Sequence, residues 1–262
     1  MSYEHIIFDV TDNIGIITLN RPDDANAIHE PLVTELADIA VRCYRDKDIR
    51  AVVLTGSGKM FCGGGDLKAF FDAGDDVPHY VDRTATVLHL AVSRFSRMDA
   101  PVVMAVNGTA AGGGFSLALV GDYVLAAESA KFISAYTASG LTPDGSSTYH
   151  LAKHVGLLRA KELILTNRLL SAEEACDWGL VSRVVPDDQL MDEAMALART
   201  IAAGPTKAFG IAKNLLATAY SENLEAQLDA ESRSIAETMG GRDGRHGVAS
   251  FLNKEKPKFT GE

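Results

Sequence analysis

The sequence predicts an α/β core followed by a helical C-terminal region. In the first part of the chain, short apolar runs rich in Val and Ile alternate with turns and amphipathic segments, a pattern typical of a sheet covered by helices. From Asp188 onward, apolar residues recur at helical spacing instead. We therefore place the α/β core at residues 1–195 and the helical region at residues 196–262.

The first half of the chain supplies most of the predicted strands. Each is a short apolar run that ends at turn residues, as expected for a buried strand. The first two runs flank Thr11-Asp12-Asn13 and predict a β-hairpin. An amphipathic helix is expected over residues 31–45. The strands are expected at residues 6–10, 14–19, 49–54, 101–106 and 123–127.

Helices dominate after about Gly140. Ser171 followed by Glu174 has the spacing of a capping box, which marks the start of a helix. Gly179 suits a helix C-cap just before a strand at residues 180–185. Later helices present one apolar face that includes Leu190 and Ala194, and another that ends at the Gly240-Gly241 pair.

Composition limits the classes of function. The net charge of −10 argues against a nucleic-acid partner, because phosphate binding needs clustered positive charge. No basic leader and no apolar stretch of membrane-spanning length is expected, so we predict a protein without membrane contact. Cys43, Cys62 and Cys176 are scattered, which suits a reducing cytoplasm, and no ligand spacing predicts a metal site.

Two glycine clusters each follow a predicted strand. They are Cys62-Gly63-Gly64-Gly65-Asp66 and Ala110-Ala111-Gly112-Gly113-Gly114. Each cluster by itself is read most simply as a tight turn. Alternatively, each turn points a bare backbone N–H at one ligand oxygen, because glycine lets the backbone approach closely. Two such donors form an oxyanion hole, worth about 3–4 kcal/mol per donor to a developing anion.

Several motifs together resemble the crotonase (enoyl-CoA hydratase/isomerase) superfamily. They are Asn20-Arg21-Pro22, the run 61–67, Val106-Asn107-Gly108 leading to the second glycine cluster, and Trp178-Gly179-Leu180-Val181. The resemblance extends over essentially the whole chain. It implies a crotonase (ClpP-like) spiral fold of ββα units with a helical C-terminal region. It also implies that this region mediates assembly of the protein into a homotrimer or a dimer of trimers.

The resemblance assigns roles to both glycine clusters. It implies that the backbone N–H groups of Gly65 and Gly113 hold the carbonyl of an acyl-CoA thioester substrate. Coenzyme A would arrive as part of that substrate, so no separate cofactor is expected. The implied coenzyme A path is lined by Ala25, Ala27, Gly65, Asp66, Leu67 and Lys68.

The catalytic carboxylates of the family's hydratases are missing from this chain. The positions that match their two glutamates hold Ser116 and Tyr136. Water addition to a double bond needs a positioned acid and base, so hydratase chemistry is doubtful here.

Asp144 is the acid that remains, in the segment Gly140-Leu141-Thr142-Pro143-Asp144-Gly145. From the residues alone it is read as a turn residue or a helix N-cap, because Asp after Pro is a common start signal. The resemblance implies a catalytic role instead, since 1,2-epoxyphenylacetyl-CoA isomerases and 4-chlorobenzoyl-CoA dehalogenases both place a catalytic aspartate there. Phe115, Tyr136 and Leu141 are expected to give it apolar surroundings.

His89 bears on the choice between those two branches. By default it is a helix histidine near the surface of the core. Its position nevertheless resembles that of the general-base histidine of the dehalogenases, whereas Tyr136 replaces a tryptophan of that branch.

We therefore expect an acyl-CoA isomerase in which Asp144 moves a proton and Gly65 and Gly113 hold the enolate. The alternatives are a hydrolytic enzyme with Asp144 as nucleophile and His89 as base, and a non-catalytic acyl-CoA-binding protein.

Overall fold

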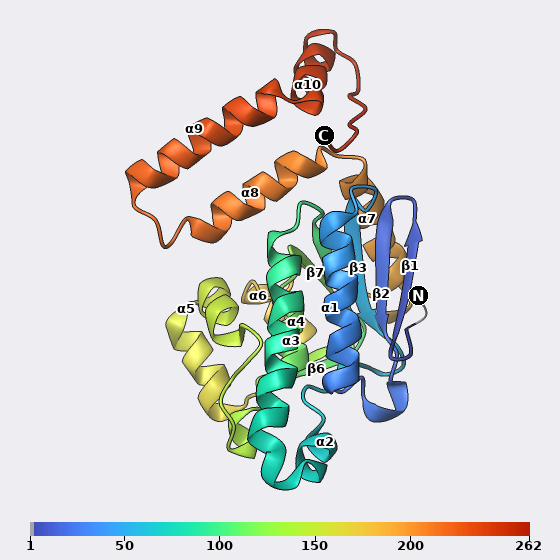
Figure 1. Cartoon of the computed structure of the whole chain (residues 1–262), viewed down its shortest axis with the longest axis vertical. Coiled ribbons are helices and arrows are strands. Elements are labelled where there is room, and N and C mark those ends of the chain that lie inside the picture. The colour runs from blue at the N-terminus through green and yellow to red at the C-terminus, as the bar shows by residue number, and fades with distance from the viewer. Residues whose placement is uncertain (1–2) are drawn as a thin grey trace.

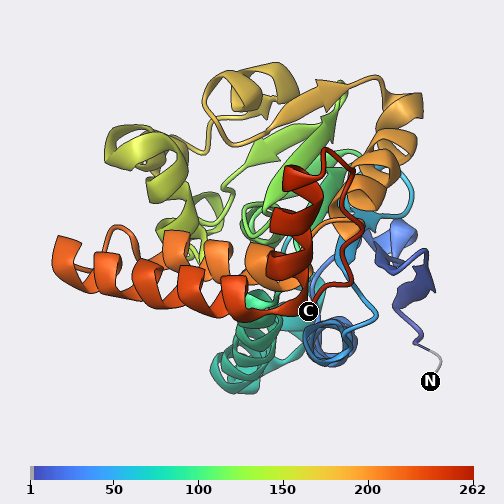
Figure 2. The ribbon, with the colours of Figure 1, turned by 90° about the horizontal axis from the view of Figure 1, so that it is seen from above.

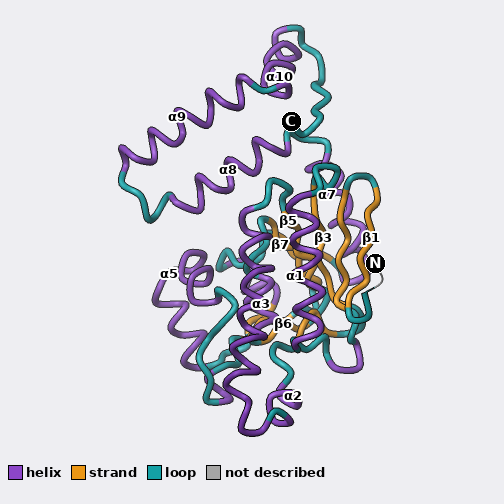
Figure 3. Tube along the Cα trace, viewed as in Figure 1, coloured by secondary structure: helices purple, strands orange, loops and turns teal. Residues whose placement is uncertain are grey.

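The computed structural model describes residues 3–262, and within this range the strands form two sheets (Figures 1 and 3). The larger sheet has the order β1-β2-β3-β5-β7-β10. Its β1–β2 pair is antiparallel and every other pair is parallel. Its strands are β1 (Ile6–Thr11), β2 (Ile14–Leu19), β3 (Ala51–Gly56), β5 (Val102–Val106), β7 (Tyr123–Ala127) and β10 (Arg183–Val185).

The smaller sheet has the order β4-β6-β8-β9. Its strands are β4 (Met60–Cys62), β6 (Thr109–Ala111), β8 (Lys131–Ile133) and β9 (Leu170–Ser171). The chain adds one strand to each sheet in turn, because β3 leads to β4, β5 to β6 and β7 to β8, and a helix follows each pair. This is the repeating ββα unit that the resemblance implied.

The helices cover both the sheet and each other. α1 (Glu30–Arg45) packs along α3 (Val77–Arg97), and both lie over the strands in Figure 3. α7 (Leu190–Ala202) contacts β3, β5 and β7 through Leu190, Ala194 and Ala198, which are buried. The other helices of the core are α2 (Leu67–Asp72), α4 (Gly113–Ala118), α5 (Ser147–Thr166) and α6 (Ala172–Asp177).

The core sits between these layers. All six residues of β3 are buried, so its sequence AVVLTG is apolar on both faces rather than alternating. Among the largest fully buried side chains are Phe61, Phe95, Phe115 and Phe132. Phe115 and Phe132 pack against each other, with ring centroids 5.8 Å apart, next to the second glycine cluster.

The C-terminal helices extend beyond the sheets. α8 (Thr206–Thr218) runs outward, α9 (Leu224–Gly240) returns beside it and α10 (Arg242–Leu252) follows (Figures 1 and 2). Lys213 of α8 is tied to Asp122 of the core at 2.6 Å. In α9 no residue is buried, and Leu228 and Ile235 are exposed. The boundary proposed at residue 195 falls within α7, and the division into two regions stays a prediction.

Most locally coded elements were predicted from the sequence. The hairpin, β7 and α9 lie where they were expected, and the Ser171 hydroxyl accepts the N–H of Glu174 at 3.1 Å, as a capping residue does. The last strand is shorter than expected, covering Arg183–Val185. Within residues 3–262, no helix is both long enough and apolar enough to cross a membrane.

Candidate active site

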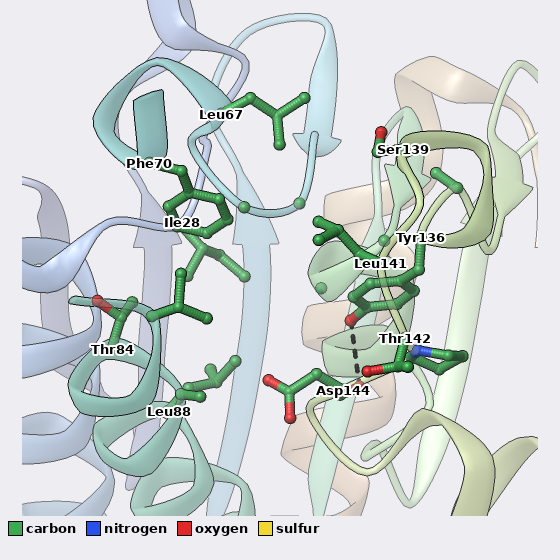
Figure 4. A pocket seen from close by; sticks show the side chains of 18 of the residues that line it. Ile28, Leu67, Phe70, Thr84, Leu88, Tyr136, Ser139, Leu141, Thr142 and Asp144 are labelled. Atoms are coloured by element: carbon green, nitrogen blue, oxygen red, sulfur yellow. Dashed lines mark hydrogen bonds between the residues drawn. The ribbon is translucent and has the colours of Figure 1, made fainter. Parts of the chain in front are cut away.

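A cavity of about 510 Å³ lies between α3 and the loop before α5 (Figure 4). Ile28, Phe70, Thr84 and Leu88 line one side in Figure 4, and Tyr136, Leu141 and Asp144 line the other. Three glycines of the first cluster and two of the second also line it. Its walls are mainly apolar, with a few polar groups, which is the usual character of a small-molecule site.

The two glycine turns touch each other at this cavity. A Cβ on Gly64 would lie 2.8 Å from the Ala111 carbonyl oxygen and 3.2 Å from the Gly113 nitrogen, so a side chain would separate the turns. Gly64 has φ 92° and Gly112 has φ 49°, values that favour glycine. Glycine is therefore needed at position 64 for close approach as well as for backbone conformation, and at position 112 for backbone conformation.

The backbone N–H groups of Gly65 and Gly113 are available to a ligand. In the part of the chain that the structure describes, neither N–H donates a hydrogen bond within the protein. The first turn is held instead by its neighbours, since Ile28 N–H donates to Gly64 O at 2.7 Å and Asp66 N–H to Ile28 O at 2.9 Å. Gly113 is the first residue of α4, where an N–H has no intrahelical partner. Both residues line the cavity.

Asp144 faces the cavity from the opposite wall (Figure 4). Its carboxylate Oδ1 lies 2.8 Å from Nε2 of His89. The N-cap interpretation of this side chain is wrong, because α5 begins at Ser147 with Ser146 as its N-cap, and the carboxylate contacts His89 instead. The expected apolar surroundings are only partly present: Tyr136 and Leu141 line the cavity, but the Asp144 side chain remains 42% exposed.

His89 reaches Asp144 from α3. The two residues are 55 positions apart in the chain, and the fold brings their side chains into direct contact. The His89 side chain is half exposed and lines the cavity. This placement agrees with a helix histidine at the edge of the core and also allows it to exchange protons with Asp144.

Ser116 and Tyr136 meet beneath Asp144. The Ser116 Oγ lies 2.8 Å from the Asp144 carbonyl oxygen, and the Tyr136 hydroxyl donates to the same oxygen at 3.1 Å. The two hydroxyls lie 2.9 Å apart. Burial raises the pKa of Tyr136 to about 12, and the charge of Asp144 adds to this, so the phenol stays protonated. The resemblance had implied only that these two positions hold glutamates in the hydratases.

The residues expected along the coenzyme A path fall into two groups. Gly65 and Leu67 line the cavity. Ala25, Ala27, Asp66 and Lys68 lie around the first glycine turn, outside the lining; Ala25 O, for example, accepts the Gly63 N–H at 2.8 Å. The carboxylate of Asp66 caps α2 and contacts Arg21 at 3.1 Å. Burial opposes ionisation of Asp66, but these hydrogen bonds and the Arg21 charge lower its pKa overall.

The α3 wall was missed by the sequence analysis. Val81, Ala85 and Leu88 lie three or four positions apart and all line the cavity. This i, i+4, i+7 spacing is the signal that could have identified the face, although it does not distinguish a binding wall from ordinary core. No group of three or more potential metal ligands is found among residues 3–262.

Comparison with known proteins decides the family. The Enoyl-CoA hydratase/isomerase family model matches residues 9–262. The chain belongs to this family. It is 39% identical to the 1,2-epoxyphenylacetyl-CoA isomerase of Escherichia coli (strain K12), covering 99% of each chain. It is 32% identical to a 4-chlorobenzoyl coenzyme A dehalogenase of an Arthrobacter species, covering 97% of this chain and 92% of the relative.

Solved structures of this family share the fold. The crystal structure of an enoyl-CoA hydratase from Bacillus anthracis superimposes with a TM-score of 0.93 at 32% identity, covering 99% of this chain and 100% of the other. The enoyl-CoA hydratase/isomerase family thus includes relatives named as isomerase, dehalogenase and hydratase. Membership establishes an acyl-CoA enzyme family, and the choice of reaction depends on the site itself.

Proposed function

We propose that the protein is an acyl-CoA isomerase that uses Asp144 to move a proton along the acyl chain. The observation that carries this proposal is the arrangement of the cavity, in which Asp144 faces two glycine turns with free N–H groups. Ser116 and Tyr136 occupy the positions where the hydratases carry glutamates, and their hydroxyls bind backbone oxygen.

The reaction follows from these groups. The thioester carbonyl oxygen accepts hydrogen bonds from the N–H groups of Gly65 and Gly113. These bonds make the proton on the adjacent α-carbon more acidic. Asp144 removes the α-proton, and the electron pair of the broken C–H bond moves onto the carbonyl oxygen as an enolate. Asp144 then returns the proton to the γ-carbon, which shifts the double bond and restores the carbonyl. Atoms and charge balance without a redox step or a separate cofactor.

Hydration is less well supported by the same site. It needs one group to activate water and another to protonate carbon. The phenol of Tyr136 stays protonated because burial raises its pKa to about 12, so it is not available as a base. Ser116 is fully buried beneath the cavity wall, and its hydroxyl faces the carbonyl oxygens of Gly112 and Asp144.

The decisive experiment is Asp144→Asn. We expect kcat to fall by about a hundredfold or more, because a positioned acid–base group is lost while size and hydrogen bonding are kept. The assay follows a β,γ-unsaturated acyl-CoA as it becomes the conjugated isomer. Asp82 lines the same cavity, so Asp82→Asn is the matched comparison and should lose much less activity. Wild-type turnover in Asp144→Asn would show that this aspartate has no chemical role.

Hydrolysis is a second candidate, favoured by the 2.8 Å contact between His89 and Asp144. In this reaction an Asp144 oxygen attacks an electrophilic carbon of the substrate and displaces its leaving group, forming an ester. His89 then removes a proton from water, which attacks the ester carbonyl and releases the product. A single turnover in labelled water incorporates label into Asp144 on this path alone. His89→Gln should then accumulate a covalent adduct visible by mass spectrometry, whereas isomerisation should survive the change.

A further inference from the structure

The Asp144 carbonyl oxygen is an unusually crowded acceptor. It lies within hydrogen-bond distance of the Ser116 hydroxyl at 2.8 Å, the Tyr136 hydroxyl at 3.1 Å and the Ser147 N–H at 3.2 Å. The dashed line in Figure 4 marks the bond from Tyr136. Ser116 belongs to α4, and Tyr136 lies in the segment after β8. These two donors therefore hold the Asp144 backbone independently of α5, the helix that follows it.

The same hydroxyls also reach the second glycine turn. Ser116 Oγ lies 3.2 Å from Gly112 O, and a Cβ on Gly113 would lie 3.8 Å from the Tyr136 hydroxyl. Ser116 has one hydroxyl proton, and the shorter contact is with the Asp144 oxygen. Because Ser116 belongs to α4, which begins at Gly113, that bond connects the loop that carries the carboxylate to the helix whose first residue carries an N–H donor. Ser116 is fully buried and the Tyr136 phenol is protonated, so the bridge is shielded from water and keeps its donors.

Backbone geometry around Asp144 makes such a bridge necessary. Gly145 has φ 62° and Ser146 has φ 71°, so two consecutive residues after Asp144 are in the left-handed region, one of them not glycine. A Cβ on Gly145 would lie 3.1 Å from the Ser116 Cβ. A strained segment of this kind keeps its conformation only when surrounding contacts fix it.

We infer that Ser116 and Tyr136 are positioning residues that fix the Asp144 carboxylate relative to the Gly112–Gly113 turn. This inference rests on the proposed role of Asp144 in catalysis. Neither hydroxyl needs to touch the substrate; each acts through the Asp144 main chain. The reaction needs the carboxylate and the anion donors at a set separation, and a misplacement of about 1 Å can cost about a hundredfold in rate.

The test compares hydroxyl deletions in two backgrounds. In the wild type, Tyr136→Phe and Ser116→Ala should each lower kcat by about tenfold or more while KM stays close to its original value. In an Asp144→Asn background the same deletions should have no further effect on kcat, because residues that act through one group are non-additive. Using both deletions keeps the test valid if one variant fails to fold, which thermal unfolding reports.

Matched controls remove hydroxyls elsewhere. The Ser134 hydroxyl is buried and has no hydrogen-bond partner among residues 3–262, and Tyr149 is 53% exposed on α5. Ser134→Ala and Tyr149→Phe should leave kcat unchanged.

The possible outcomes separate the two hypotheses. If Asp144→Asn keeps wild-type turnover, the proposed function fails and the positioning role fails with it. If Asp144→Asn is impaired but both hydroxyl deletions keep wild-type kcat, the positioning role alone is overturned. A kcat loss that is equally large in the Asp144→Asn background also overturns it, because the hydroxyls would then act on the substrate directly.

Discussion

Replacing Gly113 by proline tests the anion site directly. Gly113 is the first residue of α4, a position that tolerates proline because its N–H has no helical partner. The preceding Gly112, at φ 49° and ψ −121°, is the mirror image of an extended residue, a conformation that glycine adopts before proline without α-region crowding. The substitution therefore removes one N–H donor, and residues 112 and 113 can keep the backbone conformation that they have in the structure.

The effect of the lost N–H on kcat can be separated from crowding by the added Cβ. Any Cβ at Gly113 would lie 2.8 Å from Cδ1 of Ile28, the flexible end of a side chain. Gly113→Ala adds the same Cβ but keeps the N–H, so the ratio of the two variants removes the contribution of the Cβ and reports the loss of the donor together with the ring carbons that replace its hydrogen. One oxyanion-hole donor contributes about 3 kcal/mol, so kcat of Gly113→Pro should be about a hundred- to a thousandfold below that of Gly113→Ala.

The assay is steady-state turnover of a β,γ-unsaturated acyl-CoA, with circular dichroism to show that both variants are folded. Equal kcat values for folded Gly113→Pro and Gly113→Ala would refute the assignment of this N–H to the anion site.

Three further predictions concern conformation, pH and assembly. Gly112→Ala should lower the free energy of unfolding by about 1–3 kcal/mol, because φ 49° with ψ −121° strains any other residue, and an unchanged thermal midpoint would contradict this. Burial opposes ionisation of Asp243, but N–H donors of the C-terminal tail lower its pKa overall. The resulting stability should be present above pH about 4 and be lost as pH falls further, and Asp243→Asn should flatten that part of the curve measured by denaturant unfolding. The exposed apolar face of α9, including Leu228, predicts a partner surface, and the family resemblance implies a trimer or a dimer of trimers; sedimentation of a stable monomer at micromolar concentration would argue against this assembly.

The elements that the sequence could predict are those with a local signal. The β1–β2 hairpin has two apolar runs around a turn, and α9 has an apolar face that ends at a glycine pair, so both are coded within a short window. The smaller sheet could not be predicted in this way. Its strands have two or three residues each, too few to show alternation, and they are defined by their partners in other segments.

The site shows the same division. Gly65, Gly113 and Asp144 could be named in advance because they lie in motifs, but a motif does not show what each residue contacts. The contact of His89 with Asp144 spans 55 positions, and the hydroxyl bridge joins Ser116 to Tyr136 across 20. Such contacts depend on how the segments are packed, which local patterns do not encode.

The anion site and the proton carrier differ in how they can change during evolution. The proposed donors at Gly65 and Gly113 are main-chain groups, so substitutions of these residues do not remove an N–H unless proline is introduced. The groups that we propose determine the reaction are side chains at positions 116, 136 and 144, and a change in one codon alters each of them. A library randomised at these three positions should therefore yield many variants that still bind thioesters but differ in reaction, which makes this scaffold a favourable starting point for directed evolution.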